Sequence, residues 1–265
     1  MIVVNLDPVL VHLGPVAISW YGLAVAAAIA AGVWLAMREV RRKGLPTEPV
    51  GDLVLWVVVG GLVGARLLHV IDRWDLYAAN PLQVLAIQNG GLAILGAILG
   101  GTLAGSLAAW RQGLPILRLA DAAAPGVILG QAVGRFGCLV TGDAVGQPTN
   151  GGWGVVYLNP GAMVPQLGVA YQPVFLYEQA WDLAVFAVLW LLRCRLTVDG
   201  QLFALYLGLY AAGKFALTFL RTETVWLWGL QEAQLLSLVG MAVAVVLTVW
   251  AHGSKVSAPA PPRVR

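Results

Sequence analysis

Residues 51–71 read GDLVLWVVVGGLVGARLLHVI, an apolar run in which Asp52, Arg66 and His69 are the main interruptions. A run of about 20 apolar residues is what an α-helix needs to cross the hydrocarbon core of a bilayer. Six other runs have a similar length and character, at residues 16–37, 91–110, 116–137, 173–196, 201–221 and 229–252. The sequence therefore predicts an all-α integral membrane protein with about seven transmembrane helices.

The composition excludes a soluble globular protein. Hydrophobic residues make up 59% of the 265 residues and charged residues only 11%, whereas about a quarter of the residues in soluble domains are charged. The 32 glycines fit a membrane protein, because transmembrane helices pack through small residues. We expect one polytopic membrane domain over residues 1–252 and a short disordered cytoplasmic tail over residues 253–265.

The sequence predicts neither a metal nor a cofactor. The two cysteines, Cys138 and Cys194, lie far apart, and the three histidines, His12, His69 and His252, share no ligand spacing. Nucleotide-binding and metalloprotease motifs are not found either. We therefore expect no bound metal, no cofactor and no nucleic-acid partner.

Positive charges predict the orientation of the spans. Eleven of the sixteen Lys and Arg residues fall on one side of the predicted spans, and the positive-inside rule makes that side cytoplasmic. These residues are Arg38, Arg41, Arg42, Lys43, Arg111, Arg118, Arg193, Arg195, Lys255, Arg263 and Arg265. The N-terminus is then outside, the C-terminus is cytoplasmic, and the 138–172 loop forms a small extracytoplasmic head. Its Gly, Pro and Asn content is compatible with a rigid head and with a mobile lid.

Other ionisable residues gather towards the outer face. They are Arg66, Arg135, Lys214, Arg221, Glu178, Asp182, Asp143 and Tyr21. Ionisable groups inside a membrane cost at least about 2.5 kcal/mol each on insertion scales, so they usually face a cavity. Because arginine offers planar, bidentate donors to phosphate, the cluster predicts a site for an anionic lipid head group or another phosphate ester. The alternative is snorkelling or plain interhelical ion pairing, such as Arg66 with Glu178.

Two segments are rich in glycine at short spacing. Residues 89–96 read NGGLAILG and are followed by Gly100, Gly101 and Gly105, a pattern typical of close helix packing. Residues 130–146 read GQAVGRFGCLVTGDAVG, in which Arg135 is flanked by glycines and Asp143 follows eight residues later. Because glycine lets the backbone approach a ligand closely, the second segment indicates more than packing.

The second segment resembles the signature of the prolipoprotein diacylglyceryl transferase family, roughly Gly-Arg-x-Gly-Asn-Phe-x-Asn-x-Glu-x-x-Gly. The matching residues are Gly134, Arg135, Gly137, Gly142 and Gly146, with Asp143 in the place of Glu. Similar elements run along nearly the whole chain: Trp20-Tyr21-Gly22, Gly64-Ala65-Arg66, Asn89-Gly90-Gly91-Leu92-Ala93, Asp121 with Pro125, Pro173 with Leu176-Tyr177-Glu178, Phe219-Leu220-Arg221 and Gln234-Leu235-Leu236-Ser237. Seven spans with an outside N-terminus are also what the family shows.

The chain departs from the family pattern at several positions. The family has Asn in place of Cys138 and Thr141, His or Tyr in place of Leu95, Arg in place of Lys214, and the His and Gln of a His-Pro-x-Gln element in place of Gln172 and Phe175. Leucine can neither accept a proton nor donate a hydrogen bond. Leu95 is therefore the departure that bears most directly on activity.

The resemblance implies transfer of the diacylglyceryl group of phosphatidylglycerol to the lipobox cysteine thiol of an exported preprolipoprotein. The protein would act in the bacterial cytoplasmic (inner) membrane, with phosphatidylglycerol, the preprolipoprotein signal peptide and membrane lipids as its partners. The catalytic residues implied are Arg135, Asp143, Tyr21 and Lys214, and the lipid-binding residues are Arg135, Arg66, Arg221, Gly142, Gly146, Asn89 and Glu178.

Within this set, Arg135 would bind the lipid phosphate, and Arg66, Arg221 and Lys214 would be supporting cations. Asp143 would orient Arg135 or the glycerol hydroxyls. The thiol proton has two routes: Tyr21 accepts it, or the arginine cluster lowers the pKa of the thiol.

Three alternatives stay open. A transporter could use the same cationic cavity for passage, although we find no clear internal repeat. A non-catalytic or functionally changed relative could bind or transport an anionic lipid. Cys138 lies three residues from Arg135 and could act as a covalent nucleophile, although a buried structural cysteine is more common.

Overall fold

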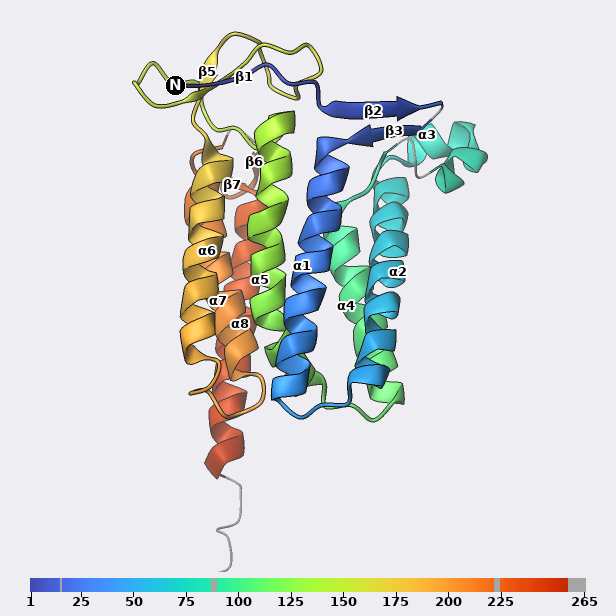
Figure 1. Ribbon diagram of the computed structural model, residues 1–265, viewed down its shortest axis with the longest axis vertical. Helices are drawn as coiled ribbons and strands as arrows, with labels where there is room; N and C mark the ends of the chain where they lie inside the picture. The colour runs from blue at the N-terminus through green and yellow to red at the C-terminus, as the bar shows by residue number, and fades with distance from the viewer. Residues whose placement is uncertain (15, 87–89, 222–224, 257–265) are drawn as a thin grey trace, which may run out of the picture. The chain divides into compact units, whose positions relative to one another are not determined.

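The computed structural model describes residues 1–14, 16–86, 90–221 and 225–256. Helices dominate them (Figure 1): α1 Trp20–Arg42, α2 Thr47–Asp72, α3 Trp74–Ala79, the 3₁₀ helix η1 Pro81–Leu85, α4 Ile94–Arg111, α5 Ile116–Thr141, α6 Val174–Leu192, α7 Gln201–Thr218 and α8 Glu232–Val256. Among the described residues, six helices (α1, α2, α4, α5, α6 and α8) are long and apolar enough to cross a membrane. This confirms an all-α integral membrane protein. The seventh span, which corresponds to α7, and the orientation stay predictions.

Some helix ends differ from the predicted spans. Residues 16–19 are not helical: they form β3, Val16–Ser19, which pairs antiparallel with β2, Val9–Leu13. Helix α4 begins at Ile94 rather than at residue 91, because Gly90 and Gly91 have φ angles of 81° and 78°, which no right-handed helix allows.

The other shifted ends have local causes. Helix α5 continues through residues 138–141 and ends where Gly142 takes a φ of 72°, the usual left-handed helix stop. Helix α8 begins at Glu232, after the hairpin of β6 (Val225–Leu227) and β7 (Leu230–Gln231), and continues to Val256. The first four residues of the predicted tail are therefore helical, and the remainder, 257–265, lies outside the described residues.

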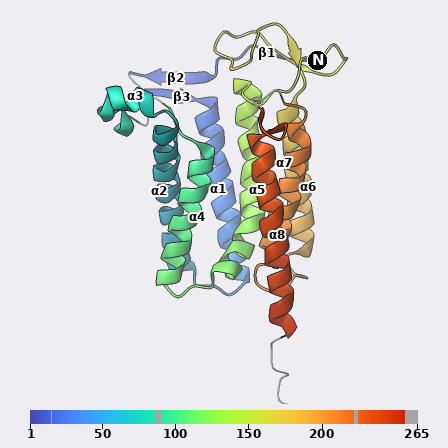
Figure 2. The same cartoon turned by 180° about the vertical axis from the view of Figure 1, so that it is seen from behind.

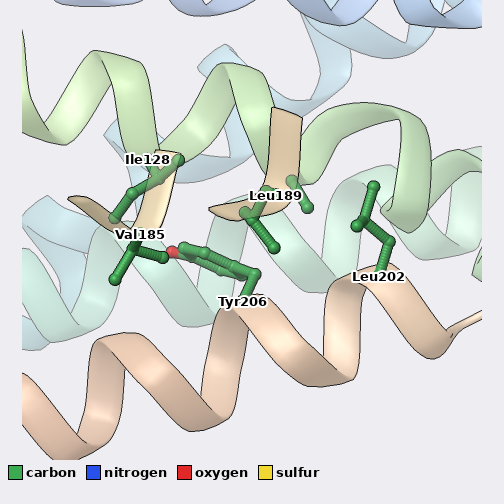
Figure 3. Close-up of a cluster of buried hydrophobic side chains, with 6 residues drawn as sticks. Ile128, Val185, Leu189, Leu202 and Tyr206 are labelled. Carbon is green, nitrogen blue, oxygen red and sulfur yellow. The ribbon is translucent and has the colours of Figure 1, made fainter. Parts of the chain in front are cut away.

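The chain divides into two compact units, Met1–Ala36 with Ala120–Arg265, and Met37–Leu119. In the first unit, α5, α6, α7 and α8 run side by side (Figures 1 and 2). Apolar side chains from α5, α6 and α7 form a buried core (Figure 3): Ala124, Ile128, Val185, Leu189, Leu202 and Tyr206. This core fixes the three helices that carry the ionisable side chains described below.

A buried carboxylate joins α5 to the start of α7. Asp121 accepts hydrogen bonds from the backbone N–H groups of Gly200, at 3.0 Å, and Phe203, at 2.9 Å. Its side chain is buried, and it satisfies N–H groups that the first turn of a helix leaves without partners. Asp121 therefore caps α7 across the bundle and sets its axial position.

Glycines on α5 allow close contact with α1 inside the first unit. A Cβ on Gly126 would lie 2.3 Å from the carbonyl oxygen of Gly32, and one on Gly137 would lie 2.8 Å from the ring of Tyr21. Small residues let transmembrane backbones approach. Part of the glycine pattern around Arg135 is thus explained by packing.

The predicted head takes in more of the chain than the 138–172 loop. Its three-stranded sheet has the order β1-β4-β5, in which β1 (Ile2–Val4) pairs parallel with β4 (Val155–Tyr157), and β5 (Ala170–Tyr171) pairs antiparallel with β4. The N-terminal strand is therefore part of the head, which lies beyond the ends of α5 and α6 (Figure 1). Beneath the sheet, a core of buried side chains includes Cys138, Tyr157 and Phe175.

The second unit is organised around the helix pair α2 and α4. A Cβ on Gly64 would lie 2.3 Å from the carbonyl oxygen of Gly96, and one on Gly100 would lie 2.3 Å from that of Gly60. The close packing that the glycine spacing predicts for Gly96 and Gly100 is confirmed.

Candidate active site

One carboxylate holds two cations in the first unit. Glu178 on α6 lies with Oε2 2.5 Å from Nη1 of Arg135 on α5, and with Oε1 2.6 Å from Nζ of Lys214 on α7. The side chain of Glu178 is only 3% exposed, whereas those of Arg135 and Lys214 are 17% and 18% exposed. The ion-pairing alternative is correct for Glu178, but its partners are Arg135 and Lys214 rather than Arg66. Two positive charges therefore share the one carboxylate of Glu178.

The two ion pairs differ in geometry. Lys214 Nζ donates a hydrogen bond to Glu178 Oε1. Oε2, facing Arg135, accepts no hydrogen bond within the part of the chain that the structure describes. The N–H groups of Arg135 therefore do not point along the line to Oε2, and the contact is an ion pair without hydrogen-bond alignment. Arginine has five N–H donors, so Arg135 retains donors for a ligand.

Packing between α6 and α7 sets the axial alignment of Glu178 with Lys214. Trp181 Nε1 donates to the carbonyl of Leu209, at 3.0 Å, and a Cβ on Gly213 would lie only 1.9 Å from the same nitrogen. The absent side chain of Gly213 thus lets the Trp181 ring lie against α7. Glu178 lies one turn before Trp181 and Lys214 follows Gly213, so this contact brings the two ionised groups together.

A second set of polar groups lies where α5 ends. The Thr141 hydroxyl is 2.8 Å from Asp143 Oδ1, to which it can donate. Arg221, three residues after α7, is 3.4 Å from the carbonyl oxygen of Asp143 through Nη2, and it interacts electrostatically with Glu178. The predicted residues Arg135, Asp143, Lys214 and Arg221 therefore belong to one neighbourhood.

Tyr21 joins this neighbourhood from α1. It interacts electrostatically with Asp143, Cys138 and Arg135, and its ring lies against Gly137. Cys138 itself is 6% exposed and belongs to the core under the head. That burial supports the structural interpretation of Cys138 over a role as nucleophile.

Neighbouring protein atoms leave no room for a side chain at the glycines around Asp143. A Cβ on Gly142 would lie 2.8 Å from Val164, and one on Gly146 would lie 2.6 Å from the carbonyl oxygen of Leu220. The Tyr157 hydroxyl, in the head, donates a hydrogen bond to the Leu139 carbonyl near the end of α5, at 2.8 Å. Burial, and then the charge of Asp143, raises the pKa of Tyr157, so the hydroxyl stays a donor.

Arg66 and Asn89 are the two predicted site residues that the structure does not bring into this group. Arg66 belongs to the second unit, where its guanidinium donates to backbone carbonyls. Asn89 lies outside the described residues. The structure thus brings together the predicted residues of the first unit.

The sequence assigned no role in the site to two of its polar side chains, Thr141 and Asp182. Thr141 positions Asp143, and the signal was its place two residues before Asp143 in a Gly-containing turn. Asp182 is 2% exposed, and its Oδ2 has no hydrogen-bond partner in the described part of the chain. It lies one helical turn from Glu178 and interacts electrostatically with Arg135 and Lys214. It therefore adds a second acidic group beneath the cations.

Comparison with known proteins decides the family. A family model described as prolipoprotein diacylglyceryl transferase matches residues 8–250. The chain belongs to the prolipoprotein diacylglyceryl transferase family. Among its relatives, a phosphatidylglycerol–prolipoprotein diacylglyceryl transferase from Nostoc sp. is 40% identical over 94% of this chain and 90% of the relative. Similarly named proteins from Synechococcus elongatus and Bacillus cereus are 39% and 38% identical, over 95% and 92% of this chain and 90% and 92% of the relatives.

Several departures from the transferase family pattern are accommodated by the structure. Lys214, in place of Arg, still reaches Glu178. Cys138 and Phe175, in place of Asn and Gln, are buried in the core under the head, and the Cys138 thiol also contacts Asp143 and Arg135. Thr141, in place of Asn, reaches Asp143. Leu95 lies in the first turn of α4, and its side chain has no polar group that could take the place of the family's His or Tyr.

Proposed function

We propose that this chain transfers the diacylglyceryl group of phosphatidylglycerol to the cysteine thiol of an exported prolipoprotein in the bacterial cytoplasmic membrane. Membership of the family and the names of the relatives support the reaction. The observation that carries the site is the sharing of the buried Glu178 carboxylate by Arg135 and Lys214. It places two positive charges beside one carboxylate, on helices that belong to a membrane protein.

The reaction needs that positive charge. The thiol sulfur forms a bond to the sn-3 carbon of the diacylglyceryl group while the bond from that carbon to the phosphate oxygen breaks. The electron pair leaves with the phosphate, which departs as glycerol phosphate, and the thiol loses its proton. Negative charge therefore grows on the leaving phosphate, and fixed cations around it lower the barrier.

Arg135 is the residue that we assign to the phosphate. Its partial exposure, and the donors that Glu178 does not engage, leave N–H groups for a ligand, and guanidinium groups bind phosphate oxygens in bidentate fashion. Glu178 serves the lipid indirectly, because it holds Arg135 and Lys214 in place. Lys214 and Arg221 are the supporting cations.

The remaining assignments follow from position. Asp143, exposed and fixed by Thr141, orients Arg135 or the glycerol hydroxyls of the lipid. Gly142 and Gly146 set the path of the backbone on either side of Asp143. Tyr21 interacts electrostatically with Asp143 and Arg135. Because a neutral phenol carries its own proton, Tyr21 would take the thiol proton only while passing its own to the Asp143 carboxylate. The other route remains: the cations could lower the pKa of the thiol directly.

The test uses purified protein, labelled phosphatidylglycerol and a peptide that carries a lipobox cysteine. We expect Arg135→Gln to abolish transfer while the variant still folds. Arg118→Gln, an exposed arginine near the other end of the same helix, should keep wild-type transfer. If Arg135→Gln retains full activity, the site assignment is wrong. Tyr21→Phe separates the two proton routes, because only direct acceptance by Tyr21 needs the hydroxyl.

A further inference from the structure

Arg66 on α2 has every guanidinium donor occupied by backbone. Its side chain is buried, at 6% exposure, and its five N–H groups face five carbonyl oxygens, which is the full donor capacity of an arginine. The acceptors are Val84 for Nε at 2.9 Å, Gly90 and Gly91 for Nη1 at 2.7 and 2.9 Å, and Gln83 and Ala86, the latter at 3.3 Å, for Nη2. Nothing is left for a phosphate.

The two glycines exist to present those carbonyls. Gly90 and Gly91 both have positive φ angles, which glycine alone adopts without strain. A Cβ on Gly91 would lie 2.8 Å from Arg66 Nη1 and 2.7 Å from His69 Nε2. The Gly-Gly pair thus lets the backbone fold onto the guanidinium.

The rest of the connection between α2 and α4 is fixed at the same place. The Arg66 guanidinium carbon lies 5.1 Å from the ring centroid of Tyr77 on α3, and Tyr77 is buried. Ala93, just before α4, donates its N–H to the carbonyl of Ala65, at 3.0 Å. The connection therefore contacts α2 both near its start, through Tyr77, and at its end, through Ala93.

Large apolar side chains of this connection face away from the protein. Trp74, Leu76, Leu82 and Leu85 are all exposed, Leu82 and Leu85 to 80% and 79%. The connection joins α2 and α4, two helices long and apolar enough to span a membrane, so it begins and ends where spans meet the surface of the bilayer. Arg66 lies six residues before the end of α2, or about 9 Å along its axis. The carbonyl groups of the connection that accept hydrogen bonds from Arg66 therefore lie below the end of α2, towards the interior of the membrane.

We propose that the described parts of the α2–α4 connection, residues 73–86 and 90–93, are embedded in the interfacial layer of the bilayer, and that Arg66 is the positioning residue that allows this. Irregular backbone at membrane depth must have its carbonyls satisfied from within the protein. Arg66 supplies those hydrogen bonds, and Trp74, Leu82 and Leu85 contact lipid. Arg66 does not bind the phosphate of the lipid substrate, which replaces the role that the sequence predicted for it.

The depth of Leu85 tests the proposal without any need for transferase activity, so its failure is separate from failure of the proposed function. A nitroxide is attached to Leu85→Cys in a Cys194→Ser background, in lipid nanodiscs, since Cys138 is buried. Collision with oxygen reports lipid exposure, and collision with a water-soluble nickel chelate reports aqueous exposure. We expect high oxygen and low nickel accessibility with Arg66 present. High nickel accessibility would overturn the interfacial placement.

Variants of Arg66 test whether this residue holds the connection at its depth in the bilayer. Arg66→Gln and Arg66→Lys should both shift the label towards water, because lysine keeps the charge but has only three donors on one atom. Arg73→Gln, on an exposed arginine of the same connection, should leave the depth unchanged. In the transfer assay, both Arg66 variants should lower kcat to a similar extent and leave KM for phosphatidylglycerol unchanged. An unchanged depth in Arg66→Gln, or a raised KM that Arg66→Lys rescues, would contradict the proposal.

Discussion

Arg135 on α5 contacts Glu178 on α6 at 2.5 Å, yet the oxygen it faces accepts no hydrogen bond in the described part of the chain. The same carboxylate binds Lys214 through an aligned hydrogen bond of 2.6 Å. Lysine thus binds the carboxylate through a hydrogen bond, and arginine binds it through charge. Because of this difference between the two contacts, Arg135 is the candidate phosphate ligand.

Glu178→Gln should destabilise the protein and stop transfer. Removing one partner of a buried ion pair leaves uncompensated charge, which costs about 3–5 kcal/mol, and here two cations lose the same partner. Thermal unfolding in detergent measures the effect. Glu48→Gln, on an exposed glutamate of α2, is the control and should change stability by less than about 0.5 kcal/mol. Equal unfolding temperatures for the two variants would show that the pairs contribute nothing.

Lys214→Arg should retain transfer, whereas Lys214→Met should lose most of it. Arginine keeps the charge next to Glu178, and methionine keeps only the length of the chain. Lys214→Met should be less destabilising than Glu178→Gln, because Glu178 keeps Arg135 as a partner. Steady-state transfer rates and unfolding temperatures of both variants check this. Activity of Lys214→Met at the wild-type level would remove Lys214 from the site.

Gly213→Ala should destabilise the protein by about 1–3 kcal/mol, the usual cost of overpacking. The new Cβ would lie 1.9 Å from Trp181 Nε1, so the indole must move and the contact between Glu178 and Lys214 must shift with it. We expect reduced transfer as well as a lower unfolding temperature.

Gly208→Ala is the matched control for this change. It lies on the same helix, where the nearest atom to a new Cβ is Ala244 Cβ at 3.5 Å, an ordinary contact. Alanine is a better helix former than glycine by about 1 kcal/mol, so Gly208→Ala should be neutral or stabilising. If both substitutions behave alike, the Trp181 contact does not set the register.

Gly142→Ala should cost more stability than Gly168→Ala. Both glycines have φ angles near the left-handed region, 72° and 76°, where an alanine costs about 1–2 kcal/mol. Only Gly142 is also crowded, since its Cβ would lie 2.8 Å from Val164, whereas Gly168 has nothing within 4 Å. The difference between the two unfolding free energies measures that crowding. Equal values would show that backbone strain alone requires glycine at residue 142.

The membrane fold was predictable because apolar runs of span length leave few other structures. The close packing of α2 on α4 was also predictable, since Gly96 and Gly100 recur at a spacing that puts them on one helix face. The participation of β1 in the head was not, because pairing of residues 2–4 with residues 155–157 depends on the tertiary fold and leaves no local pattern.

The sequence predicted which residues form the site but not which of them pair with one another. Charge and glycine patterns identified Arg135, Asp143 and Lys214 as a group. The choice of Glu178 as the shared partner depends on the register between α5, α6 and α7. Arg66 shows the limit most clearly: a buried arginine next to a Gly-Gly pair could bind phosphate or carbonyls, and only the path of the backbone decides between them.

Mass spectrometry of a lipobox peptide, after incubation with the purified protein and phosphatidylglycerol, tests the proposed transfer. We predict a thioether-linked diacylglyceryl peptide, formed with release of glycerol phosphate, and no product from a peptide with serine in place of the cysteine. Formation of this product would also show that the reaction tolerates Leu95. Unmodified peptide, beside full conversion by an active relative under the same conditions, would contradict the proposed transferase activity and favour a relative that binds anionic lipid without transferring it.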